Sequence, residues 1–93
     1  MDVDQAEAIA VAALAFLAQD MKRLGRFLAL TGVGPAELRE QARTARVLAA
    51  VLDHLSHDES LLLAFAATGA VAPQEIAKAQ RVLERAADGG GHA

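Results

Sequence analysis

The chain has 93 residues, of which 54% are hydrophobic and none is cysteine, and its formal net charge is −3 at pH 7. This length fits one domain with a single small core, and the lack of cysteine excludes a disulfide framework, thiol catalysis and a cysteine-ligated zinc site. The apolar run over residues 8–18 is too short to span a membrane and follows acidic residues, so we expect a buried helix in a cytoplasmic protein.

The first two elements are predicted to be helices with aspartate caps. Asp4 and Glu7 have the spacing of a capping box, which would open the first helix. This helix is apolar on nearly every side, which is typical of a helix surrounded by its neighbours. Asp20 is the predicted cap of a second, amphipathic helix. The apolar stripe of the second helix is predicted to be Met21, Leu24, Phe27 and Leu28.

Glycine and proline define the next boundaries. The second helix should end at Gly32, and the third should begin at Pro35, because proline is favoured in the first turn of a helix. We expect a break near residues 43–44, and one continuous helix to residue 55 is the alternative. The fourth helix is predicted to face the core with Val47, Leu48, Val51, Leu52 and Leu55.

Two further helices complete the predicted fold. Ser56 and Glu59 have the spacing of a second capping box, which would open a fifth helix that Gly69 closes. Pro73 should open a sixth helix, and residues 89–93 are expected to form a disordered tail. The inner positions of the sixth helix are predicted to be Ile76, Ala79 and Leu83.

An internal repeat with an offset of 38 residues relates the two halves of the chain. The matches fall on helix caps, turn prolines and core positions. They predict an all-α fold, a compact bundle of five or six short helices in two pseudo-repeated three-helix units (residues 5–43 and 44–87) within one domain, residues 1–88. The matched pairs include Asp20 with Asp58, Phe27 with Phe65, and Pro35 with Pro73.

Charge is segregated along the chain, with six basic and two acidic residues between positions 21 and 50. Such a basic face can orient an acidic protein partner while an apolar patch supplies affinity. Leu63 lies about a quarter-turn from the core stripe of its helix, so it marks either this apolar patch or a fifth helix that is buried all round. The candidate interaction residues are Lys22, Arg23, Arg26, Arg39, Arg43, Arg46 and Leu63.

Residues 53–59 include two histidines and three carboxylates, which carry donor atoms that a divalent metal ion binds. A helix boundary at Ser56 would separate Asp53 and His54 from the acids that follow. Capping and a local hydrogen bond of His54 account for this segment, so no metal site is predicted. The sequence also has no catalytic motif and no phosphate-binding loop, so we expect no enzyme, cofactor or small-molecule substrate.

The alternative to a protein partner is nucleic acid, bound by the same basic face of the second and third helices. Arg39, Arg43 and Arg46 have the spacing of a stripe along one helix face, which phosphate contacts would favour. The chain is acidic overall, however, and its three phenylalanines occupy core-like positions, so bases would have no aromatic surface to stack on.

Three strings carry a resemblance to a known family. They are residues 26–32 (RFLALTG), residues 35–39 (PAELR), and residues 51–55 (VLDHL) followed by DESLLLAF at 58–65. With these strings the chain resembles, over about residues 6–83, small alphaproteobacterial proteins catalogued as domain of unknown function 3572. The resemblance implies an all-helical cytosolic protein without an assigned activity. We therefore expect a non-catalytic protein-interaction, accessory or regulatory module, or a homodimer, with no membrane segment.

Overall fold

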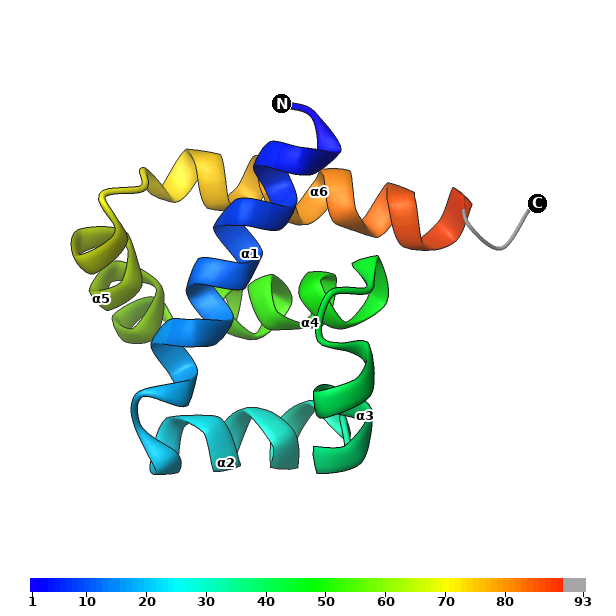
Figure 1. Cartoon of the computed structure of the whole chain (residues 1–93). Helices are drawn as coiled ribbons and strands as arrows, with labels where there is room; N and C mark the ends of the chain where they lie inside the picture. The colour runs from blue at the N-terminus through cyan, green and yellow to red at the C-terminus, as the bar shows by residue number, and fades with distance from the viewer. Residues whose placement is uncertain (90–93) are drawn as a thin grey trace.

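The computed structural model describes residues 1–89, which form six α-helices and contain no strand (Figure 1). The predicted all-α class is confirmed, and so is the break between the third and fourth helices. Thr44 caps the fourth helix, because its hydroxyl accepts a hydrogen bond from the amide of Val47 at 3.3 Å. The helices are α1 (Val3–Ala18), α2 (Met21–Thr31), α3 (Pro35–Gln41), α4 (Ala45–Ser56), α5 (Glu59–Gly69) and α6 (Pro73–Gly89).

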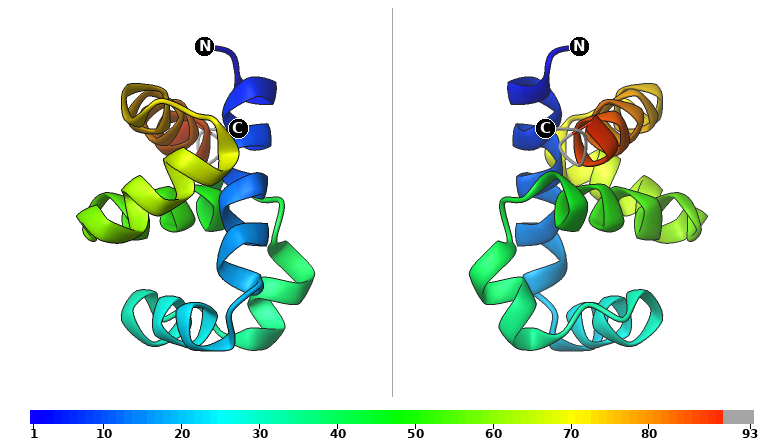
Figure 2. Two further views of the ribbon diagram at one scale, coloured as in Figure 1. Left: turned by 90° about the vertical axis from the view of Figure 1, so that its left-hand side faces the viewer. Right: turned by 90° about the vertical axis from the view of Figure 1, so that its right-hand side faces the viewer.

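The core lies where α1, α4 and α6 pack against one another. In Figure 2, α4 and α6 lie on the same side of α1, while α2 and α5 occupy the periphery. α2 contacts α1 and α4, and α5 contacts these two helices and α6. α3 is a short connection with no buried residue. The fully buried large side chains are Phe27, Phe65, Leu17, Leu48, Leu52, Leu55, Ile76, Leu83, Val47 and Val51.

α1 is buried on one face only, which differs from the prediction. Ala6, Ala10 and Ala13 are fully buried, whereas Ala8 and Ala12 on the other face are exposed. Alanine occupies both faces, so hydropathy does not distinguish the buried side. The small inward side chains allow α6 and α4 to pack closely on α1, and the exposed ones cost little free energy because each has a small apolar surface.

Two predicted capping boxes are wrong. α1 begins at Val3, and its capping box joins Asp2 to Gln5 instead of Asp4 to Glu7. The chain offers this spacing twice in succession, and the structure uses the first copy.

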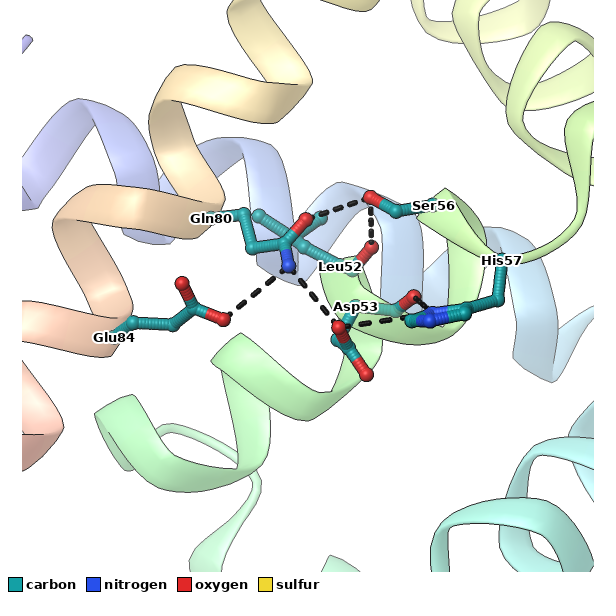
Figure 3. A network of polar contacts seen from close by, with 6 residues as sticks. All are labelled: Leu52, Asp53, Ser56, His57, Gln80 and Glu84. Carbon is teal, nitrogen blue, oxygen red and sulfur yellow. Dashed lines mark hydrogen bonds and ion pairs between the residues drawn. The ribbon is translucent and has the colours of Figure 1, made fainter.

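At the start of α5 the cap is Asp58, whose carboxylate accepts from the amide of Leu61 at 3.1 Å. The predicted cap, Ser56, is the last residue of α4, and its hydroxyl lies 3.0 Å from the carbonyl oxygen of Leu52 and 2.6 Å from Gln80 Oε1. Figure 3 shows Gln80 of α6 reaching across to Ser56 and Asp53 of α4. Ser56 therefore helps to hold α6 on α4.

The helix boundaries recur at the 38-residue offset. Asp20 caps α2 as Asp58 caps α5, and both helices have 11 residues. Each ends in a left-handed residue, Gly32 with φ 77° and Ala70 with φ 54°. Gly69 is the last residue of α5, as predicted, and Ala70 is its left-handed cap. Prolines then open α3 and α6 as predicted.

The larger arrangement is less symmetric than the boundaries. α3 has 7 residues and α6 has 17, and α6 packs across both α1 and α4. The arrangement as two pseudo-repeated units and the domain end at residue 88 therefore stay predictions. α6 includes Gly89, the first residue of the predicted tail, and residues 90–93 lie outside the described part of the chain.

Within residues 1–89, none of the helices alone has both the length and the apolar composition of a membrane span. α5 and α6 meet those criteria only when taken together, and they are bent by 103° with respect to each other.

Candidate functional site

A groove between α2 and α5 gathers most of the titratable side chains that the sequence singles out. It consists of two adjoining pockets of about 230 and 350 Å³, which share Arg26, His54, Asp58 and Ser60. We call it the α2–α5 groove. Its remaining lining residues are Arg23 and Leu30 of α2, His57 at the end of α4, and Glu59, Leu61 and Ala64 of α5.

His54 forms the floor of the groove. Only 7% of the residue is exposed, and its ring meets that of buried Phe27 edge-on, with 5.4 Å between the ring centroids. The predicted local hydrogen bond of His54 is absent: the imidazole has no hydrogen-bond partner among residues 1–89. The neighbouring His57 instead places Nδ1 2.8 Å from the carbonyl oxygen of Asp53.

The charge state of His54 follows from these surroundings. Burial is the largest influence and lowers the pKa of His54 below its ordinary value of 6.5; Arg26 and His57 lower it further, while Asp58 and Asp53 raise it. The net result is a lowered pKa, so the imidazole is neutral at neutral pH. A neutral imidazole has one nitrogen that donates and one that accepts a hydrogen bond.

The two arginines of α2 differ in their contacts with other side chains. The guanidinium carbon of Arg23 lies 4.7 Å from the centre of the Phe16 ring, a cation–π geometry. Arg23 Nε also lies 3.9 Å from an oxygen of Asp20. Arg26 has no ion pair within residues 1–89 and lines both pockets of the groove, so its guanidinium is available to a ligand there.

The other candidate residues are distributed over different surfaces. Arg46 pairs with Glu37, and Arg43 lines a separate pocket of about 610 Å³ beside Asp4 and Glu7 of α1. Lys22 and Arg39 are exposed outside the groove. The structure thus brings only Arg23 and Arg26 into one pocket.

Exposed apolar side chains supply features that the sequence reasoning missed or left open. Leu63 is 49% exposed, and Phe65 is the one buried residue of α5 among the described residues, so α5 is not buried all round. Leu30 is 66% exposed and lines the groove. In the sequence Leu30 falls outside the predicted core stripe of its helix, and this position could have indicated that its side chain is exposed. Met21 was assigned to that stripe, but it is 89% exposed, because the first residue of α2 extends past the core.

The model of a family described as "Protein of unknown function (DUF3572)" matches residues 3–86, nearly the whole chain. The chain belongs to this family. The match confirms the resemblance carried by the three sequence strings. No match to the chain was found among curated proteins or among solved structures. Membership of this family assigns no activity to the protein.

The chemistry of the groove in this DUF3572 protein favours binding of a charged group. Arg23 and Arg26 line it from α2, and Asp58 and Glu59 from the start of α5. Ser60 and His54 line the same pockets, and no hydrogen bond joins them. Within residues 1–89, no three histidine, aspartate or glutamate side chains are grouped so that they could hold a metal ion.

The first turn of α2 places positive charge against the helix dipole. Lys22 and Arg23 follow the cap, and the turn contains no acidic residue. The N-terminus of a helix carries a partial positive charge that favours anions by about 0.3–1 kcal/mol each. A local charge arrangement that opposes stability is expected where the residues serve binding.

Replacing exposed Lys22 by glutamate should therefore stabilise the protein. We expect Lys22→Glu to raise the free energy of unfolding by about 0.5 kcal/mol and the melting temperature by a few degrees. Thermal unfolding followed by circular dichroism measures this. Lys78→Glu, in the second turn of α6, is the control and should leave the melting temperature nearly unchanged. An equal gain in both variants would show that the helix dipole is not the cause.

Proposed function

We propose that this DUF3572 protein is a non-catalytic, cytoplasmic protein-interaction module that binds an acidic segment of another protein in the α2–α5 groove. Arg23 and Arg26 would supply electrostatic orientation, and apolar side chains in and beside the groove would supply affinity. An accessory or regulatory role towards a larger protein fits such a module.

One observation carries the proposal: exposed Leu30 lies in the same groove as Arg26, which has no ion pair among the described residues. A large exposed apolar side chain next to an available cation gives a surface the two properties that a protein interface combines, apolar contact and charge complementarity. Met21 and Leu63 add exposed apolar area on the same two helices. The free-energy cost of this exposed area would be recovered when a partner covers it.

The test is charge reversal on the groove. Arg23→Glu combined with Arg26→Glu should reduce partner binding by about tenfold or more, because like charges would face the acidic segment. The partner is first recovered from cytosol with the wild-type protein and identified. Its affinity for purified wild-type and variant proteins is then measured by calorimetry.

Lys78→Glu with Arg81→Glu is the matched control, since it makes the same charge change on α6. Both variants should melt close to the wild type. Loss of the Arg23 contacts with Phe16 and Asp20 costs roughly 0.5–1 kcal/mol, and a glutamate at the third position of α2 recovers a similar amount. Equal affinities of the two double variants would contradict the proposal, as would binding of duplex DNA by the wild type near physiological salt, the result expected for a nucleic-acid-binding module.

A further inference from the structure

We propose that His54 and Arg26 form a carboxylate-binding site in the α2–α5 groove, which takes an aspartate or glutamate side chain of the partner. The proposal rests on the proposed function and names the chemical group that the groove recognises.

The imidazole of His54 has no partner inside the described part of the protein. His54 is more than nine-tenths buried, lines both pockets of the groove, and has no hydrogen-bond partner within residues 1–89. No side-chain nitrogen or oxygen in that part of the chain is both fully buried and without a partner. The ring nitrogens of His54 are therefore reachable from the groove. The N–H of the neutral imidazole can therefore donate a hydrogen bond to a carboxylate that enters the groove.

Arg26 lies in the same groove as His54. Arg26 lines the same two pockets, and its positive charge is close enough to lower the pKa of His54. A guanidinium presents two parallel N–H donors to a carboxylate, which makes it the preferred cation for this planar group. Together Arg26 and His54 offer donors from two helices that converge on one pocket.

The acidic residues of the groove decide which anion it takes. The charged and titratable groups around His54 are two arginines, Arg23 and Arg26, and three carboxylates, Asp53, Asp58 and Glu59, with His57 beside them. A phosphate group carries a charge of about −1.5 to −2 at neutral pH, so these carboxylates repel it more strongly than they repel a singly charged carboxylate. The groove accordingly favours a carboxylate.

The test uses acetate as the probe and nuclear magnetic resonance as the readout. Sodium acetate is titrated into isotopically labelled protein at neutral pH, and sodium chloride keeps the ionic strength constant. We expect saturable shifts of the His54 ring signals and of the Ser60 amide. Arg26→Gln should weaken acetate binding by about threefold or more, and Arg81→Gln, an exposed arginine on α6, should leave it unchanged.

Three results would overturn the site: shifts that chloride reproduces, acetate binding that Arg26→Gln does not weaken, or tighter binding of inorganic phosphate than of acetate. The carboxylate site and the proposed function can be contradicted independently of each other. Loss of partner binding in the charge-reversed variant without acetate binding at His54 would remove the carboxylate site alone. Acetate binding together with unchanged partner affinity in that variant would support the site and contradict the interaction module.

Discussion

Replacing Phe27 by alanine should destabilise the protein by about 3–5 kcal/mol. Phe27 is fully buried, and it is the one buried residue of α2 in the described part of the chain. Its ring reaches the edge of the His54 ring, so truncation removes apolar contacts and leaves a cavity between α2 and α4. A chain of this size loses about 4–8 °C of melting temperature per kcal/mol, so the melting temperature should fall by more than about 12 °C.

Thermal unfolding followed by circular dichroism measures this loss. Leu30→Ala is the matched control, because Leu30 lies on the same helix and is mostly exposed; its stability should stay within about 0.5 kcal/mol of the wild type. Similar losses in the two variants would mean that Phe27 does not anchor α2 as the structure describes.

The two left-handed helix caps should respond in opposite directions to exchange of glycine and alanine. A left-handed backbone costs an L-residue roughly 1–2 kcal/mol and costs glycine nothing comparable. Ala70→Gly removes this strain at φ 54°, whereas Gly32→Ala introduces it at φ 77°. We expect Ala70→Gly to raise the free energy of unfolding by about 0.5–1 kcal/mol, because the greater freedom of glycine in the unfolded chain offsets part of the relieved strain. We expect Gly32→Ala to lower it by about 1 kcal/mol.

Urea denaturation measures the change in the free energy of unfolding of each variant. No atom lies within 4 Å of a β-carbon built on Gly32, so a loss there reports backbone strain and not a steric clash. Each variant is the control for the other, since the same two residue types are exchanged at corresponding ends of α2 and α5. Changes of the same sign would exclude cap conformation as the cause.

Local chemistry explains which boundaries the sequence predicts well. Asp20, Gly32, Pro35 and Pro73 each act on the backbone within a few residues of themselves, so their effects can be inferred without the fold. The errors arise where neighbouring residues compete. Two overlapping capping-box spacings precede α1, and Ser56 pairs with Gln80 of α6 instead of capping α5.

The candidate site is predicted less completely, because its residues come from different helices that meet only in the folded protein. The sequence places Arg23 and Arg26 on one helix, and the structure brings both into the groove. The sequence cannot indicate that His54 of α4 lies next to these arginines, since the position of His54 depends on how Phe27 packs α2 against α4. Nor can spacing alone separate Arg43 and Arg46 from the groove, because their neighbours, Asp4 and Glu37, come from elsewhere in the chain.

The marginal packing of α3 has a consequence for hydrogen exchange and local unfolding. α3 has no buried residue, and the Arg46–Glu37 pair that joins it to α4 has a largely exposed guanidinium, so it contributes at most about 1 kcal/mol. Segments with few buried contacts open at the low end of a protein's range of local stabilities. We therefore expect α3 to belong to the first cooperative unit to open. Phe27 and Val33 are buried and lie outside α3, so we expect the wall that α2 contributes to the groove to persist while α3 exchanges its amide protons.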